Sequence, residues 1–157
     1  MCTGRLNQRN IYSARPICIA RLLEHSFRFH KRGRDGSGKA DAFVTGSPTD
    51  MVWGVVNYVD SSEEQLLDGA EGLGQGYRKK EVIVEDRNCR QHVALMYAAQ
   101  ESHIDFELRP YSWYTRFVIS GARQHALPVG YIARIDSMPS TEDPDQRRDQ
   151  RERAVIC

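Results

Sequence analysis

The sequence predicts an α+β domain in which a small, mixed but mainly antiparallel sheet curls toward a barrel and helices pack outside it. The first observation is a series of short β-branched or aromatic segments separated by tight turns, because strands joined in this way pair antiparallel without a crossover helix. The second is Gly54, which lies inside the clearest strand, 51–59, and indicates a bend such as a barrel corner. The third is the helical recurrence of apolar residues over 110–125.

The composition is that of an ordinary globular protein. Its 157 residues suffice for one domain with a buried core, and 40% of them are hydrophobic and 27% charged. The net charge of +1 gives no general attraction to nucleic acid or membranes, and no apolar run could span a bilayer. We expect a domain at 1–138, without a nucleic-acid or membrane partner. A polar, charged tail at 139–157, disordered or loosely helical, should follow it.

Neither the cysteines nor the histidines form a metal-ligand motif. The four cysteines are scattered without a C-x-x-C pair, which argues against a zinc ribbon and a disulfide framework and favours a reduced, cytoplasmic protein. His25 and His30 have no ligand pair nearby, and His92 stands alone on a predicted strand. We expect these histidines to be structural or solvated, and we expect no bound metal.

The remaining elements can be placed by periodicity and turn residues. One helical turn opens the chain, and a short helix at 62–68 has serine caps and acidic residues at its start. A further short helix follows Pro128 and carries apolar residues to position 135. The predicted strands are 17–20, 26–30, 41–45, 51–59, 79–85 and 89–98.

Residues 33–40 imitate a phosphate-binding loop. They satisfy G-x-x-x-x-G-K, but Ala40 stands where such a loop needs Ser or Thr to hold Mg²⁺. A short strand follows, whereas a phosphate loop needs a helix whose amino end faces the phosphates. We therefore expect a mobile, solvated loop here and no nucleotide.

The stretch 66–77 is the best candidate for a site. Four glycines fall within eight residues, after a short helical run, and Glu71 lies among them. Glycines allow tight turns and the close approach of a ligand, and a carboxylate held at such a turn can act as a general base. A plain surface connection is the alternative interpretation of such a turn.

Three segments together resemble the γ-glutamylcyclotransferase (AIG2-like) family. They are W-G-V-V at 53–56, D-x-x-E-G at 68–72 with G-Y at 76–77, and G-A-x-x-x-x-L-P-x-x-Y at 121–131. The resemblance spans about residues 1–136 and preserves the order of the motifs. It is fairly specific because all three segments occur.

The resemblance implies a reaction without metal or cofactor. In this family the free α-amine of a γ-glutamyl compound attacks its own γ-carbonyl, giving 5-oxoproline and a free amine. Glu71 matches the family's general acid/base, and Tyr77 matches a tyrosine that lines the substrate pocket. Met1, Cys2 and Gly72 correspond to further positions around the substrate. The expected partners are a small γ-glutamyl molecule and, in a homodimer, a second copy of the chain.

One departure from the family concerns the beginning of the chain. In the family a first strand ending in Y-G-S-N precedes the position of Met1, and its amides hold the substrate's α-carboxylate. This strand is missing from the chain as given, so we expect little release of 5-oxoproline and an open sheet edge that favours self-association. If the chain is active, Arg5 or Arg123 are our first candidates for binding the carboxylate. The alternatives are a misplaced start, a binding protein of the same fold without catalysis, or an enzyme for another γ-glutamyl metabolite.

Overall fold

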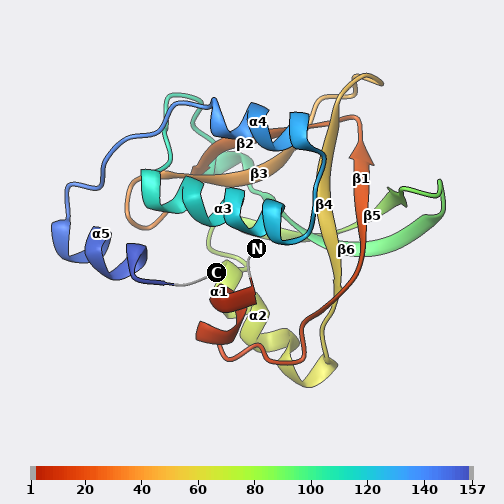
Figure 1. The fold of residues 1–157 in the computed structure, drawn as a ribbon, viewed down its shortest axis with the longest axis horizontal. Coiled ribbons are helices and arrows are strands. Elements are labelled where there is room, and N and C mark those ends of the chain that lie inside the picture. Colours follow the sequence, from red (N-terminus) through yellow and green to blue (C-terminus); the bar gives the residue numbers. More distant parts are fainter. Residues whose placement is uncertain (1–2, 156–157) are drawn as a thin grey trace.

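The computed structural model describes residues 3–155 of the chain (Figure 1). Its elements are all short, as expected for a chain punctuated by glycine and proline. They are α1 (Thr3–Gln8), β1 (Arg15–Leu23), β2 (His25–Arg32), β3 (Gly38–Val44), β4 (Met51–Tyr58), a 3-10 turn (Ser61–Glu63), α2 (Glu64–Glu71), β5 (Tyr77–Asp86), β6 (Gln91–Ala99), a second 3-10 turn (Glu101–His103), α3 (Ser112–Gln124), α4 (Val129–Asp136) and α5 (Gln146–Arg153).

The strands form two antiparallel sheets. One has four strands in the order β4-β1-β5-β6, and the other is the hairpin β2-β3. The α+β class and the mainly antiparallel pairing are thus confirmed.

The predicted closure into a barrel is wrong for the described residues. β1 pairs with β4 along its whole length, and β5 pairs with β6 in the same way. The β1-β4 pair and the β5-β6 pair are joined through β1 and β5. Within residues 3–155 these two strands share only two residue pairs, Ala20 with Asp86 and Arg21 with Glu85. Beyond these pairs β1 and β5 diverge, so the backbone hydrogen bonds do not run around a closed cylinder. The missing first strand stays a prediction.

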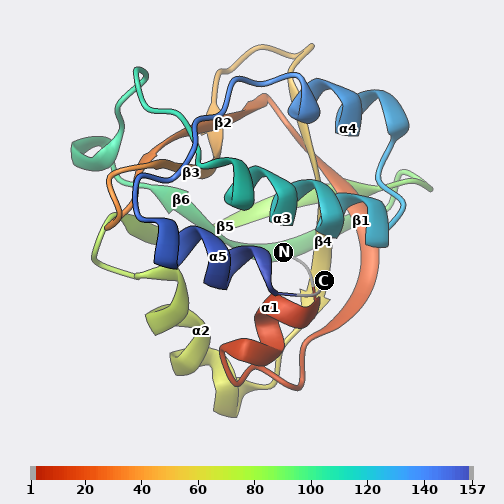
Figure 2. The same cartoon turned by 60° about the vertical axis from the view of Figure 1, so that its left-hand side comes forward.

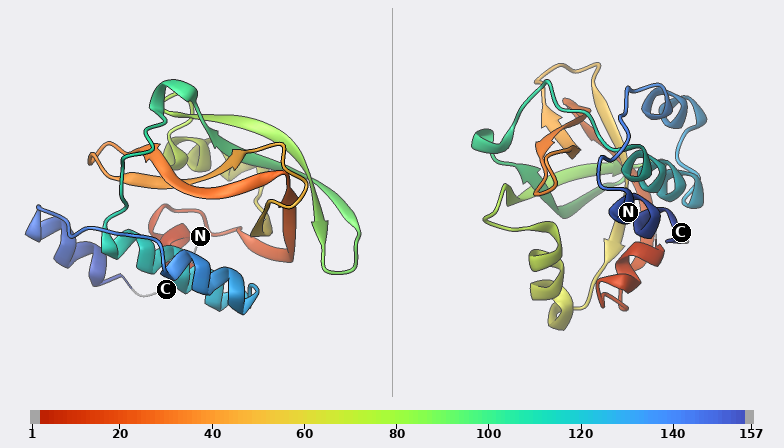
Figure 3. Two further views of the ribbon diagram at one scale, coloured as in Figure 1. Left: turned by 90° about the horizontal axis from the view of Figure 1, so that it is seen from above. Right: turned by 90° about the vertical axis from the view of Figure 1, so that its left-hand side faces the viewer.

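The main core lies between the β2-β3 hairpin and the helices α3 and α4. Figure 3 shows these helices on one side of the hairpin, with α5 beside α3. The alternation predicted for 26–30 places Phe27 and Phe29 of β2 on the inner face, where their rings meet edge-to-face at 4.9 Å. They pack against buried residues of α3 and α4, including Ile119, Ile132 and Ile135.

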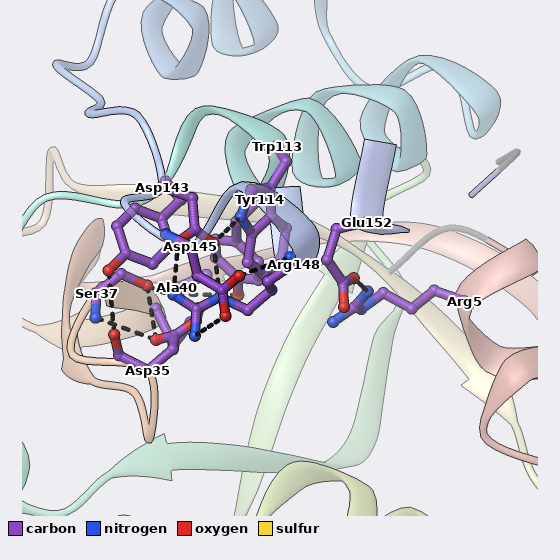
Figure 4. A network of polar contacts seen from close by, with 12 residues as sticks. Arg5, Asp35, Ser37, Ala40, Trp113, Tyr114, Asp143, Asp145, Arg148 and Glu152 are labelled. Atoms are coloured by element: carbon purple, nitrogen blue, oxygen red, sulfur yellow. Dashed lines mark hydrogen bonds and ion pairs between the residues drawn. The ribbon is translucent and has the colours of Figure 1, made fainter. Parts of the chain in front are cut away.

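The end of the chain, predicted as a disordered or loosely helical tail, contains a short helix. Residues 146–153 form α5, whose N-cap Asp145 accepts a hydrogen bond from the Arg148 amide. Asp143 is buried, accepts a hydrogen bond from Trp113 Nε1 at 2.8 Å and forms an ion pair with Arg148 (Figure 4). The many charges of this segment pair with one another and with α3, which gives it order without a large apolar surface. A domain boundary at residue 138 stays a prediction.

Candidate active site

The glycine turn ends α2 and places Glu71 in the last helical turn. The predicted helix stopped at residue 68, but the structure continues it to Glu71 because Gly69 is tolerated within it. Gly72 ends the helix in the left-handed conformation, with φ of 74°. Its backbone amide donates hydrogen bonds to the carbonyl oxygens of Asp68 and Gly69. Gly72 therefore acts as a helix cap, and a direct role in substrate binding stays a prediction.

The Glu71 carboxylate is held by an arginine that directly follows α1. Arg9 Nη1 lies 2.7 Å from Glu71 Oε1, and the Glu71 side chain is 19% exposed. Figures 1 and 2 show α1 and α2 at the same end of the molecule, beside the end of β4. No local pattern in the sequence links Arg9 to Glu71, because 62 positions separate the two partners.

Glu71 lines a cavity of about 650 Å³. The cavity lies against the four-stranded sheet, where β1 and β5 diverge, and most of its wall is apolar. This volume falls within the range of roughly 300–1,000 Å³ that is usual for small-molecule sites. The wall includes Leu6 of α1, Glu64, Leu67 and Glu71 of α2, Ile17, Ala20 and Leu22 of β1, Val52 and Gly54 to Tyr58 of β4, Lys79, Val82 and Val84 of β5, and Val93 to Tyr97 of β6.

A second polar group lies one helical turn before Glu71. Asp68 accepts a hydrogen bond from the Tyr97 hydroxyl at 2.5 Å and pairs with Lys79 at 2.9 Å. Burial alone would raise the pKa of Asp68, but these two donors hold that pKa below its usual value. Asp68 is thus kept ionised and held by its own partners, and Glu64, which also lines the cavity, pairs with the same Lys79.

Tyr77 is buried beside the site, and its hydroxyl is used by the fold. It donates to the Ala40 carbonyl at 2.7 Å, while the Ala40 amide donates to the Tyr114 hydroxyl. Burial, and the nearby Tyr114 and Glu71, raise the pKa of Tyr77, so it stays neutral. The predicted contact of Tyr77 with substrate stays a prediction.

The other residues named from the sequence are distributed as follows. Met1 and Cys2 lie outside the described residues. Arg5 pairs with Glu152 at 2.8 Å and lies over the Phe117 ring (Figure 4 shows the ion pair). Arg123 pairs with Asp136 at 3.6 Å and is 65% exposed in its side chain. Neither arginine contacts Glu71, so the structure does not bring our first candidates for carboxylate binding to it.

In the loop 33–40, which matches the phosphate-loop pattern, the Asp35 carboxylate occupies the hydrogen-bond donors of the loop. Asp35 accepts hydrogen bonds from the Ser37 amide, the Ser37 hydroxyl and Lys39 Nζ, the last at 2.7 Å. Lys39 leads into β3 rather than a helix. An anion at the centre of the loop would meet Asp35, which argues against phosphate binding.

Metal and membrane features can be assessed over residues 3–155. Each of the three histidines singled out in the sequence has a structural hydrogen bond: His25 to Leu23, His30 to Asp41 and His92 to Asp86. Within this range no group of three or more His, Cys, Asp or Glu side chains is arranged to hold a metal ion. None of its helices is long and apolar enough to cross a membrane.

Comparison with known proteins identifies the family. The model of the AIG2-like family matches residues 51–135, more than half of the chain. The chain belongs to the AIG2-like family. This match includes β4, the glycine turn with Glu71, and α3 and α4, and it confirms the resemblance seen in the sequence.

Relatives of this AIG2-like chain are named as cyclotransferases. The human and mouse proteins called gamma-glutamylcyclotransferase are each 28% identical to it. The human match covers 88% of this chain and 73% of the relative, and the mouse match covers 97% and 81%. A solved structure named gamma-glutamyl cyclotransferase has a TM-score of 0.78 at 27% identity, covering 88% of this chain and 82% of the other. YkqA from Bacillus subtilis shares the fold, with a TM-score of 0.72 at 23% identity over 87% of this chain and 51% of that protein.

Proposed function

We propose that this AIG2-like protein is a γ-glutamylcyclotransferase-like enzyme that converts a γ-glutamyl amino acid or amine to 5-oxoproline and a free amine. The observation that carries the proposal is the position of Glu71, whose carboxylate is fixed by Arg9 at 2.7 Å and lines the cavity of about 650 Å³. The names of the relatives support the same reaction class. Cys18 and Cys89 are free thiols, which fits a reducing, cytoplasmic enzyme of glutathione or related γ-glutamyl metabolism.

The reaction needs one group that moves a proton. The substrate's α-amine attacks the γ-carbonyl carbon, so a C–N bond forms in a five-membered ring. The bond from this carbon to the leaving nitrogen then breaks. Glu71 accepts the proton that the attacking amine loses and returns it to the leaving amine. Nothing is oxidised or reduced, and no water is consumed.

The rest of the barrier is lowered by positioning. An extended γ-glutamyl chain must fold back so that its amine meets its own carbonyl, and a concave, mostly apolar wall favours that compact form. Well-oriented intramolecular reactions of this kind gain up to roughly 7–11 kcal/mol. Arg9 contributes by fixing the Glu71 carboxylate, so that the base is already oriented when the substrate binds.

The test is release of 5-oxoproline from γ-glutamyl dipeptides by the wild type and by Glu71→Gln. The amide is nearly isosteric and keeps an oxygen for Arg9, so the variant should fold normally. Turnover should fall by about 10²–10⁴-fold, the usual contribution of a positioned acid–base group. Glu152→Gln is the matched control, because Glu152 also pairs with an arginine, Arg5, and its side chain is about as exposed as that of Glu71; it should keep its activity. Equal rates for the wild type and Glu71→Gln would remove Glu71 from the mechanism.

A binding protein without catalysis is the second candidate, and the apolar character of the cavity wall favours it. Such a protein would bind γ-glutamyl compounds or 5-oxoproline in calorimetric titration and release no product. A homodimer, expected from the sequence, is an independent proposal.

A further inference from the structure

Gly54, inside β4, is a residue of the cavity wall that the backbone does not require to be glycine. It pairs in regular register with Ala20 of β1, and the irregularity of that ladder lies elsewhere, between Pro16 and Cys18. Its φ is not positive. A glycine within a strand lowers stability and often marks a bulge, a bend or the close approach of another group. The regular ladder and the ordinary backbone conformation favour the last of these reasons.

The protein itself does not make that approach. Apart from its neighbours in the chain, no atom of residues 3–155 lies within 4 Å of a Cβ built on Gly54. Gly38, at the start of β3, is the contrasting case, because a Cβ there would clash with the Phe29 carbonyl oxygen. Gly54 instead lines the cavity that also contains Glu71. The missing side chain at position 54 therefore leaves room in the cavity.

The part of the cavity around Gly54 is apolar. Its wall there is made by side chains of one buried cluster: Ala20, Leu22, Val56, Val82, Val84 and Met96. Within residues 3–155 the charged side chains of the wall are Glu64, Glu71 and Lys79, on α2 and near the start of β5. Lys79 is already paired with Glu64 and with Asp68. An apolar group is therefore favoured beside Gly54 over a charged one.

Gly54 and Glu71 lie toward opposite ends of this wall. β4 lines the cavity from Gly54 to Tyr58, which spans roughly 13 Å at about 3.3 Å per residue. The α2 helix, which carries Glu71, lies beside the end of β4 (Figure 1). A γ-glutamyl group that reacts at Glu71 leaves the far end of the wall unfilled. The part of a substrate that can reach Gly54 is the substituent on the leaving nitrogen.

We propose that Gly54 is a specificity-determining residue, which keeps the far end of the cavity open for an extended, uncharged apolar substituent on the leaving nitrogen. This inference rests on the proposed function and names its substrate class: γ-glutamyl amides of long alkyl or arylalkyl amines. A side chain at position 54 would occupy the space that the end of this substituent takes.

The test is a comparison of binding that needs no turnover. Its ligands are the N-methyl and N-hexyl monoamides of glutaric acid, which lack the α-amine and so cannot cyclise. In calorimetric titration the wild type should prefer the hexyl amide by about 10–100-fold, because methylene groups gain affinity when they are buried. Gly54→Val should lower this preference by about 10-fold or more. Its melting temperature should be unchanged or higher, because valine favours a strand and glycine weakens it.

Gly130→Val is the matched control. A Cβ at Gly130 also has no atom of residues 3–155 within 4 Å, but this glycine lies on α4, outside the cavity wall. The control should keep the preference for the hexyl amide. The inference is overturned if the wild type binds both ligands equally or neither at millimolar concentration. It is also overturned if Gly54→Val keeps the preference, or if Gly130→Val loses it as well.

The remaining outcomes separate this inference from a structural role and from the proposed function. If Gly54→Val and the smaller Gly54→Ala both lower the melting temperature, Gly54 belongs to the strand and the inference is overturned. Release of 5-oxoproline from γ-glutamyl methylamide and hexylamide, without a preference in binding, would overturn the inference alone. A hexyl preference in binding, without release of 5-oxoproline from either amide, would overturn the cyclotransferase proposal alone.

Discussion

The Arg9 guanidinium at the end of α1 contacts the Glu71 carboxylate at the end of α2, with 2.7 Å between Arg9 Nη1 and Glu71 Oε1. This contact links the two short helices that flank the open end of the four-stranded sheet (Figure 2). It also fixes the one carboxylate on which the proposed chemistry depends. Arg9 therefore acts on the reaction through Glu71, as a positioning residue.

Arg9→Leu should lower kcat/KM by up to about 10²-fold, because a misplaced base is costly even when it is present. Its effect on stability should be small, since partly exposed pairs contribute about 0.2–1 kcal/mol. The measurement is 5-oxoproline release together with urea unfolding. Arg5→Leu is the control, one turn earlier on α1, and loses a comparable ion pair to Glu152. Equal losses of activity in both variants would mean that α1 acts as a whole and that Arg9 has no special role.

Gly76→Ala should destabilise the protein. Gly76 has φ of 113°, and an added Cβ would meet Lys31 and His103 at 2.7–2.9 Å. Backbone strain of this kind costs about 1–3 kcal/mol, to which the contacts add. The measurement is the free energy of unfolding in urea.

Gly69→Ala is the opposite case in the same segment. Gly69 lies within α2 and has no atom within 4 Å of an added Cβ. It should stabilise the protein by about 0.5–1 kcal/mol. A loss of stability in Gly69→Ala similar to that in Gly76→Ala would show that the whole turn tolerates no side chain.

These cases show which parts of the structure the sequence could predict. The glycine turn, the strand around Gly54 and the helix over 110–125 have local signals, and the structure contains all three. Arg9, the partner of Glu71, and Trp113, one partner of Asp143, have none, because they lie 62 and 30 positions away. The polar composition of the end of the chain allows either disorder or a loose helix, and the contacts of α5 with α3, such as Arg153 with Ser112, join positions far apart in the sequence. The lack of closure between β1 and β5 could not be predicted, because the sequence pattern of a strand does not indicate how many residue pairs it will form with a neighbouring strand.

Asp143 should make the attachment of α5 depend on pH. Hydrogen bonds from Arg148, and further ones from Trp113 and Asp145, lower the pKa of Asp143 to about 2 although burial opposes this. The usual value is about 3.9. A carboxyl whose pKa is lower in the folded state stabilises that state above the unfolded value and loses this contribution as pH falls from about 4 through about 2. The Trp113 indole N–H resonance should report this loss by NMR.

Asp143→Asn should remove this pH dependence and cost about 1–3 kcal/mol, because Arg148 loses a charged partner. Asp145→Asn is the matched control. The Asp145 side chain caps α5 and is 52% exposed. Asparagine caps helices about as well as aspartate, so the substitution should keep the helix. A transition between pH 4 and 2 that persists in Asp143→Asn would assign it to another carboxyl.

The divergence of β1 and β5 should make the protein self-associate. Among residues 3–155, only two residue pairs join these strands, so most of the facing edges have backbone groups without a strand partner in that range. Ile17, on β1 at the bulge in its pairing with β4, is 59% exposed. Exposed edges with apolar side chains pair with other chains, and a lysine there opposes such pairing. Ile17→Lys should therefore shift the protein toward monomer in sedimentation velocity over a range of concentrations. Val129→Lys should have no effect, because Val129 is 83% exposed but lies on α4. A wild type that is monomeric at every concentration, or equal effects of both lysines, would mean that the diverging strands are not the site of association.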